Sequence, residues 1–323
     1  MANKISRVQK DELYQFFEGT VPRGFKNDFD ESLFNSKTHR ALQSSDKWHS
    51  FHLARKDKKK VLASIHFYLE KNTALSPVSA PFGSFEVSHA ATTEQLFEFI
   101  QFVERRLIKY GAKKVIVKFP PEKYDVSNQN KLAVLLFNHQ YQVHHAELGA
   151  CLSISNTTFI DVIDSWERRK LKQSWKSNLS FKIIPRSQLN EIFNFILACR
   201  EERGHSLSMT FKELNATVKK LQNHFVLFGV YHSSDLIAAS IAIKVNKKVL
   251  YNFYSAHSKA SDKLSPVVFL IGEMYDWCAK HSFELLDLGT SAWGGKPNFP
   301  LIDFKLRLGA APTMKLTFEK MLA

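Results

Sequence analysis

The segment 283–310 holds the residues best suited to chemistry. An apolar run in it ends in Asp287-Leu288-Gly289, and a loop rich in glycine and proline leads on to Phe304-Lys305. An ammonium such as that of Lys305 neutralises a phosphate, or the oxyanion that forms at a carbonyl under attack. The alternative is a lysine whose stem packs on a half-buried element while its amine stays in water.

Two further side chains are candidates for catalysis beside Lys305. Asp287 directly follows the apolar run, where it could orient an amine or the lysine itself. An aspartate in such a place is also a common acceptor for loop backbone. Tyr254 ends another apolar run and could act as a general acid toward a leaving group. Its alternative is a core tyrosine whose hydroxyl is satisfied by a neighbour.

A second group of residues has the chemistry of substrate binding. Trp293 stands beside Gly294-Gly295, so its ring could cover a substrate or anchor the loop on the core. Three basic side chains close a predicted helix at 191–203 and could bind phosphate or carboxylate, or be no more than a solvated helix end. They are Arg200, Arg203 and His205.

These residues need elements that bring them together. An apolar strand over 283–288 would deliver the glycine loop at its carboxyl end, where α/β sheets bind ligands. Pro266 favours the first turn of a helix before that strand. The runs 225–231, 236–245 and 249–254 have strand character and precede the helix.

The two halves of the sequence repeat each other. The runs 61–65 and 237–241 share a pattern at an offset of 176 residues (61 to 237). Each is followed by an extended stretch, a loop with proline, an amphipathic helix and a short apolar strand. We therefore expect mixed α/β sheets in two related domains, 1–158 and 159–323, with a last strand near 313–318 that completes a sheet. The pattern at 10–17 predicts a short helix.

The chain is strongly basic. It has 45 Lys and Arg against 31 Asp and Glu, a formal charge of +14. This surplus favours an anionic partner such as a phosphate-rich donor, RNA or an acidic membrane surface, and the alternative is a basic surface without a dedicated partner. The segment 166–177 concentrates cations that could form such a surface. They are Arg168, Arg169, Lys170, Lys172 and Lys176.

The cysteine and histidine patterns do not predict a disulfide framework or a metal site. Cys151, Cys199 and Cys278 are far apart, and His144-His145 has no second pair of ligands at metal spacing. The sequence shows neither an apolar leader nor a run of about 18 apolar residues, which is the length that a membrane span needs. We therefore expect a cytoplasmic protein, with peripheral contact with an anionic membrane left open.

The segment 283–310 also resembles a known family. An apolar strand ending in Asp-Leu-Gly, a glycine-rich loop, then Phe304-Lys305 and Gly309 is similar to the second domain of FemAB-like acyltransferases, which are tandem members of the GNAT (N-acetyltransferase-like) superfamily. The order strand, strand, loop, helix, strand in both halves resembles the core of a GNAT domain. The resemblance implies two tandem GNAT-like domains.

The same resemblance implies transfer of an acyl or aminoacyl group from acyl-CoA or aminoacyl-tRNA to an amine, whether of a peptide, a peptidoglycan precursor or a small molecule. The usual acetyl-CoA loop of that superfamily is glycine-rich, and this sequence has no glycine there. The residues that would meet a donor phosphate are His257, Ser258, Lys259 and Lys263. The donor stays open, and a non-catalytic module that binds an anionic ligand, RNA or a membrane is the alternative function.

Overall fold

The computed structural model describes residues 13–43, 45–293 and 296–322. The chain divides into unit 1, Met1–Ala146 with Met314–Ala323, and unit 2, Glu147–Thr313. This division differs from the expected segments 1–158 and 159–323. Two long strands explain the difference, because β8 (Gln142–Ser153) leads the chain from unit 1 into unit 2 and β16 (Ala311–Met321) leads it back.

Unit 1 has a mixed sheet with the strand order β1-β3-β4-β5-β7-β16. All neighbours are antiparallel except β5 and β7. Two short strands, β2 and β6, also pair with β4. The strands are β1 (Tyr14–Glu18), β2 (Lys26–Asn27), β3 (Trp48–Arg55), β4 (Lys60–Glu70), β5 (Thr73–Ser76), β6 (Glu86–Val87) and β7 (Lys114–Lys118).

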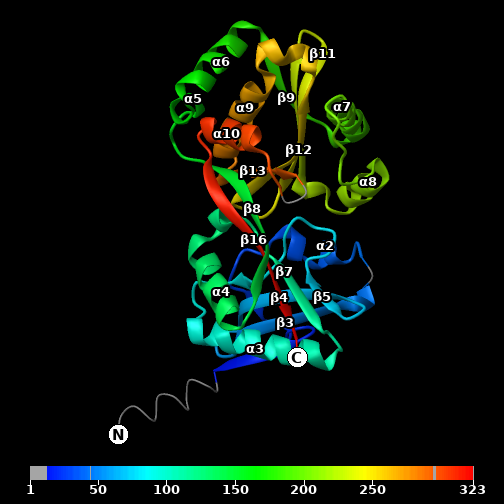
Figure 1. Ribbon diagram of the computed structural model, residues 1–323, viewed down its shortest axis with the longest axis vertical. Coiled ribbons are helices and arrows are strands. Elements are labelled where there is room, and N and C mark those ends of the chain that lie inside the picture. Colours follow the sequence, from blue (N-terminus) through cyan, green and yellow to red (C-terminus); the bar gives the residue numbers. More distant parts are fainter. Residues whose placement is uncertain (1–12, 44, 294–295, 323) are drawn as a thin grey trace. The chain divides into compact units, whose positions relative to one another are not determined.

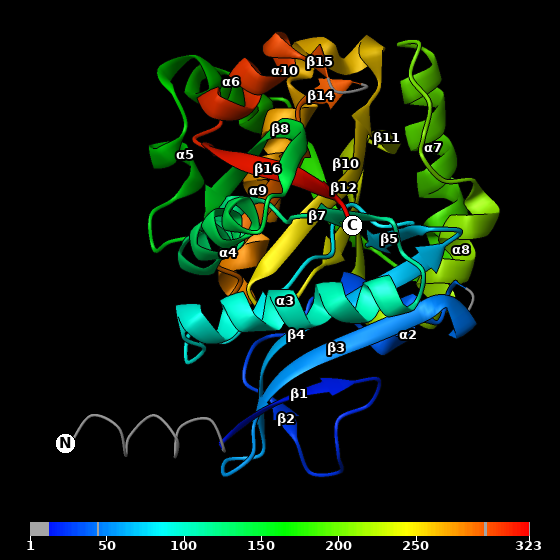
Figure 2. The ribbon, with the colours of Figure 1, turned by 60° about the horizontal axis from the view of Figure 1, so that its bottom comes forward.

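The longest helix of unit 1 covers one face of this sheet. Thr92 and Gln95 form a capping box at the start of α3 (Thr93–Lys109), and its buried residues, such as Phe99 and Val103, pack on β3 and β4 (Figure 2). The other helical segments are η1 (Leu33–Asn35), α2 (Lys37–Arg40), η2 (Ser45–Lys47), η3 (Glu122–Tyr124) and α4 (Val126–Asn138).

Unit 2 has the strand order β9-β10-β11-β12-β13-β8, with β12 and β13 parallel and the other neighbours antiparallel. This is the order of unit 1 repeated, strand for strand and direction for direction. The runs 61–65 and 237–241 lie in β4 and β11, which hold the same place in the two orders. The strands are β9 (Leu179–Ile184), β10 (Phe225–His232), β11 (Asp235–Lys244), β12 (Val249–His257) and β13 (Leu285–Thr290).

Helices cover both faces of the unit 2 sheet. α9 (Pro266–Lys280) packs on one face and α7 (Leu189–Glu201) on the other (Figure 1). Phe228 and Leu286 belong to the apolar core beneath α9. The remaining elements are α5 (Phe159–Val162), α6 (Ser165–Lys176), η4 (Arg186–Gln188), α8 (Phe211–Lys220), η5 (Gln222–His224), η6 (Lys259–Leu264), β14 (Ala292–Trp293), β15 (Lys296–Pro297) and α10 (Phe299–Arg307).

The helix expected over 10–17 is wrong for the part that the structure describes. Tyr14–Glu18 is a strand that pairs with β3. Tyr14 and Phe16 alternate toward the core, and Phe16 stacks on Phe99 and Phe102. The side chains of this segment therefore follow the two-residue period of a strand. Residues 10–12 lie outside the described part of the chain.

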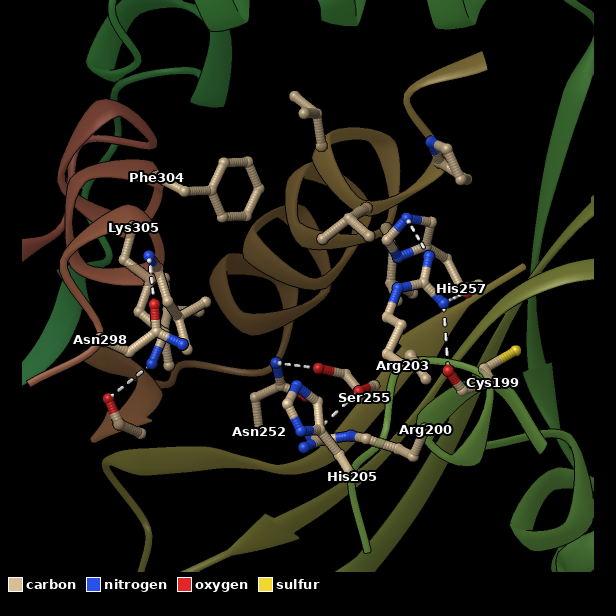
Figure 3. A pocket seen from close by; sticks show the side chains of 18 of the residues that line it. Cys199, Arg200, Arg203, His205, Asn252, Ser255, His257, Asn298, Phe304 and Lys305 are labelled. Carbon is tan, nitrogen blue, oxygen red and sulfur yellow. Dashed lines mark hydrogen bonds between the residues drawn. The ribbon is translucent and has the colours of Figure 1, made fainter. Parts of the chain in front are cut away.

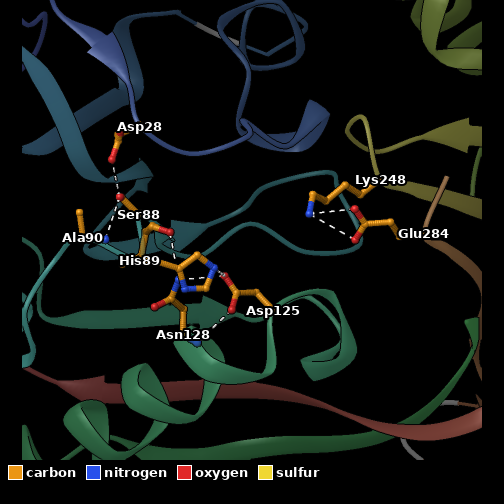
Figure 4. Close-up of polar contacts among 9 residues, drawn as sticks. Asp28, Ser88, His89, Ala90, Asp125, Asn128, Lys248 and Glu284 are labelled. Carbon is orange, nitrogen blue, oxygen red and sulfur yellow. Dashed lines mark hydrogen bonds and ion pairs between the residues drawn. The ribbon is translucent and has the colours of Figure 1, made fainter. Parts of the chain in front are cut away.

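The two units differ where a strand of unit 1 is interrupted. β12 runs unbroken beside β11, whereas β5 stops at Ser76 and β6 resumes the pairing with β4 only at Glu86. The intervening segment turns inward, so that Phe82 is buried and Gly83 donates to the Lys118 carbonyl of β7. After β6, Asn128 of α4 donates to the Val87 carbonyl, as part of a polar group with Asp125 (Figure 4).

Candidate active site

Strands β12 and β13 run together for only three residues. The parallel pairing ends at Tyr251 and Asp287, after which β12 stays with β11 while β13 stays with β8 as far as Thr290. A register shift opposite Ile241 and Ala242 adds a β-bulge to β12, which bends the strand further. The two strands therefore diverge, and a pocket of about 690 Å³ lies within unit 2 between them, α9, the end of α7 and α10.

Lys305 reaches this pocket from helix α10. Its side chain is held by two hydrogen bonds, because Nζ donates to the carbonyl oxygens of Gly289 at 2.9 Å and Thr290 at 3.0 Å (Figure 3). The residue is only 7% exposed. Burial lowers the pKa of Lys305 to about 8, although the nearby carboxylate of Asp287 opposes the shift. The amine can therefore exist in both protonation states at moderately alkaline pH.

Asp287 supports the turn beneath that lysine. Its Oδ1 accepts a hydrogen bond of 2.7 Å from the amide of Gly289, whose φ of +76° lies in the left-handed region. Asp287 is fully buried and does not belong to the described lining of the pocket. It therefore acts on Lys305 through the backbone turn and through its charge.

A cationic wall faces Lys305 across the pocket. Arg200, Arg203 and His205 all line it, as the sequence suggested they could, and Figure 3 shows them opposite Phe304 and Lys305. Arg200 donates to the Ser255 carbonyl at 3.3 Å, and burial lowers its pKa. Among the described lining residues, four Lys and Arg side chains compare with one carboxylate, that of Asp262. The pocket thus suits an anionic ligand.

Arg203 joins the other end of that wall to strand β12. Its Nη1 donates to the carbonyls of Cys199 and His257 at 3.1 and 3.0 Å. Nε2 of His257 lies 2.7 Å from Oδ1 of Asp262, and burial lowers the pKa of this histidine against the pull of the carboxylate. Nη2 of Arg203 lies 3.5 Å from the same oxygen, so the Asp262 carboxylate contacts two basic side chains.

Several candidates named from the sequence do not line the pocket in the described structure. The Tyr254 hydroxyl instead lies 2.5 Å from Oγ of Ser208, and its ring stacks on Phe253. Of the residues proposed for a donor phosphate, only His257 lines the pocket, because the loop coils into η6. Those left outside are Ser258, Lys259 and Lys263. Trp293 belongs to β14, but its side chain and Gly294-Gly295 lie outside the described part of the chain, so their role at the pocket stays a prediction.

Other lining residues could not be singled out from the sequence. Tyr251 is half-buried at the point where β12 and β13 part, and desolvation of its hydroxyl raises its pKa well above the ordinary tyrosine value. Asn252 accepts from Ser240 at 2.6 Å and donates to Ser255 at 3.2 Å. The available signal was a set of polar side chains in adjacent strands that are otherwise apolar.

The basic segment on α6 is less uniform than expected. Arg169, Lys172 and Lys176 are exposed. Arg168 instead donates to the carbonyls of Ile160 and Ile163, which ties α6 to the segment before it. Lys170 pairs with Glu167 at 3.2 Å and lines the pocket. The exposed basic face therefore contains Arg169, Lys172 and Lys176, and not all of the cations that the sequence suggested.

The described part of the chain has neither a candidate metal cluster nor a helix that could span a membrane. No cluster of His, Cys, Asp or Glu there could hold a metal ion, and the three cysteines are buried thiols. None of the described helices combines the length and the apolar character that crossing a membrane requires.

Comparison with known proteins identifies the fold around this pocket. The model of the acetyltransferase (GNAT) domain family matches residues 167–304, within unit 2. Residues 167–304 therefore form a GNAT-type domain. The crystal structure of FemX resembles it with a TM-score of 0.71 over 95% of this chain and 97% of that one, at 10% identity. The chain therefore has the fold of FemX along nearly its whole length.

Two further solved structures are similar at lower scores. L-PGS from Bacillus licheniformis has a TM-score of 0.52 and 14% identity and covers 80% of both chains. The C-terminal domain of a putative lysylphosphatidylglycerol synthetase from Agrobacterium fabrum has a TM-score of 0.51 and 10% identity, over 80% of this chain and 81% of that one. No curated protein sequence matches this chain.

Proposed function

We propose that the pocket of unit 2 transfers an acyl or aminoacyl group from an activated donor to an amine, without a covalent enzyme intermediate. The observation that carries this proposal is the placement of Lys305 at the opening between β12 and β13, with Nζ bound to two carbonyls. The described lining holds no pair of nucleophile and base, so positioning and electrostatics must supply the rate.

The reaction would proceed by direct attack. The amine nitrogen adds to the carbonyl carbon, and the carbonyl π electrons move to the oxygen. The ammonium of Lys305 neutralises this oxyanion, or a phosphate of the donor. The oxyanion then collapses, the bond to the leaving group breaks, and the amine loses a proton as the leaving atom gains one. β12 supports the geometry, because its edge beyond Tyr251 is not paired with β13.

The donor is either acyl-CoA or aminoacyl-tRNA. A GNAT domain favours acyl-CoA in general, and both donors carry phosphate that Arg200, Arg203 and His257 could meet. The acceptor is an amine of a peptide, a peptidoglycan precursor or a small molecule. The name of the putative lysylphosphatidylglycerol synthetase adds a phospholipid head group to the acceptors worth testing.

A thermal-shift panel tests the proposal. We expect one donor class to raise the unfolding midpoint, because only a ligand that prefers the native state does so. Binding of charged tRNA should weaken more steeply with salt than binding of acyl-CoA, since more phosphates are neutralised. A donor that binds is then combined with each acceptor class and the products are analysed by mass spectrometry. Absence of transfer with every donor and acceptor pair would contradict the proposal.

A further inference from the structure

Helix α6 carries an unusual combination of side chains on its outer surface. Glu167, Leu171 and Ser174 form its buried side, which packs on α9. With 3.6 residues per turn, the exposed residues Arg169, Lys172 and Lys176 form a stripe opposite that side. We call these three residues the basic stripe.

Two tryptophans border the basic stripe, one on each flank. Trp166 is 55% exposed and Trp175 is 50% exposed. Large aromatic side chains are rarely left so accessible on a protein that meets only water, and they concentrate where one end is apolar and the other wet. Arg169 lies over the Trp166 ring at 5.0 Å, so cation and indole share one surface. The basic stripe has no ion pair with any other described residue.

We propose that α6 docks unit 2 on an anionic lipid surface, with both indoles at the level of the head groups and the basic stripe against the lipid phosphates. Each Lys or Arg near an anionic leaflet strengthens binding about fivefold, so the stripe alone contributes about a hundredfold. Tryptophan is enriched at membrane interfaces because its ring is apolar and its N–H polar. A helix with such residues lies in the plane of the interface.

Nucleic acid fits this surface less well. Three cations contact about three phosphates, which gives a shallow salt dependence and weak binding. The two flanking indoles lie about 13 Å apart along the helix axis, at 1.5 Å per residue, and on opposite sides of the stripe. A lipid surface receives both of them without any particular sequence or spacing of bases.

The docking surface adjoins the pocket of unit 2. Lys170, on the same helix, lines the pocket, and Gln173 donates to the Lys263 carbonyl of η6. Arg307 of α10 binds Glu167 at 3.0 Å, so α6 and α10 lie side by side (Figures 1 and 2). Phe299, at the start of α10, is 67% exposed. Docking through α6 would therefore bring the rim of the pocket to the lipid.

Sedimentation with vesicles tests the charge. Vesicles of phosphatidylcholine and phosphatidylglycerol in equal parts should bind the full chain, and vesicles of phosphatidylcholine alone should not. The double variant Arg169→Gln/Lys172→Gln should bind about 30-fold more weakly. The matched control is Lys56→Gln/Lys58→Gln in the exposed β3–β4 hairpin of unit 1, which changes the net charge equally and should bind like the unaltered protein.

The indoles are tested separately with Trp166→Ala/Trp175→Ala. This variant should lose about tenfold or more in binding, and the loss should persist at high salt because it removes apolar area. The vesicle-induced blue shift of tryptophan fluorescence should shrink with it. Equal unfolding midpoints of all variants would show that they fold, as expected for exposed side chains.

Equal binding to neutral and anionic vesicles would overturn the docking proposal. So would undiminished vesicle binding by Arg169→Gln/Lys172→Gln or by Trp166→Ala/Trp175→Ala. A third contrary result would be that Arg169→Gln/Lys172→Gln weakens binding to RNA and leaves binding to vesicles unchanged. None of these measurements needs turnover. Membrane docking through α6 is therefore tested independently of the proposed transfer reaction.

Discussion

At the scale of single residues, Lys305 makes the clearest prediction. Replacing it with Met keeps the buried stem and removes the charge, so kcat should fall by about 10²–10³ for transfer to the true acceptor. Lys305→Arg should restore part of the rate, because its fork places the charge differently. The Gly289 and Thr290 carbonyls lose their donor, so the Met variant should also unfold more easily by about 1–3 kcal/mol. A Met variant with full turnover would remove Lys305 from the reaction.

The lowered pKa of Lys305 gives a pH prediction with a definite sign. If the ammonium is the active form, turnover should fall as the pH rises through about 8, where the amine loses its proton. The Arg variant retains its charge in this range, so its smaller rate should stay level through the same pH. Steady-state rates of both proteins across this window check the prediction. A rate that rises through pH 8 would instead assign Lys305 the role of a base.

The pocket shows how far single residues can be predicted from sequence. Lys305, Arg200 and Arg203 line one pocket. Lys305 could be predicted from the family motif, and the two arginines from their position at the end of a helix. Tyr254 does not line the pocket, because its hydroxyl lies against Ser208 and its ring stacks on Phe253. Regular alternation would place Tyr251 and Tyr254 on opposite faces of the strand, whereas the bulge brings them to the same face. A bulge has no reliable local signature in a sequence.

At the scale of elements, the turn that ends β13 can be tested through glycine. Gly289→Ala should cost about 1–2 kcal/mol of unfolding free energy, since L-residues avoid its positive φ. The added methyl would also approach the Tyr251 ring at 3.4 Å. The control is Gly19→Ala in unit 1, with a φ of +78° and open space around the new methyl.

Denaturant unfolding should show similar losses for both alanine variants. Turnover should fall only for Gly289→Ala, because that turn supplies one of the carbonyls that hold Lys305. Equal loss of turnover in Gly19→Ala would mean that general destabilisation explains the effect.

The type of an element could be predicted from the sequence where the hydrophobic periodicity extended over several turns. The prediction failed where the segment was short. α9 begins at Pro266, where the sequence placed a helix start, and α3 is the amphipathic helix expected after the run 61–65. The short β1 was mistaken for a helix. The sequence also did not indicate that the strand paired with β4 would be interrupted between β5 and β6. Tertiary pairing with β3 and β4 decides these segments, and local propensity does not.

At the scale of the whole molecule, the exchange of strands at the unit boundaries predicts which fragment folds. A fragment cut as 159–323 lacks β8, which pairs with β13 through Leu152 and Leu286. It should show no cooperative thermal transition, because the buried strand β13 loses one neighbour. The fragment 147–313 keeps that pairing and should melt cooperatively by circular dichroism. A cooperative transition in 159–323 would show that β8 is dispensable.

The duplication itself was predictable, whereas its boundaries were not. Two copies of one pattern indicated two related α/β domains, and the repeated strand order agrees with this. The sequence does not indicate that β8 completes the sheet of unit 2 and β16 that of unit 1, because both segments have the ordinary composition of strands. Only the pairing of Phe318 with Val117 in β7 reveals that the end of the chain belongs to unit 1.

That return strand sets the order of events during synthesis. Domains usually fold in the order in which they leave the ribosome. In this protein the edge of β7 is open until residues 317–321 have emerged, long after the rest of unit 1. Unit 2, whose β8 is made first, has all its strands earlier. The amino-terminal half is therefore the last to be completed, and a nascent chain stalled before residue 314 would present an unpaired strand edge to chaperones.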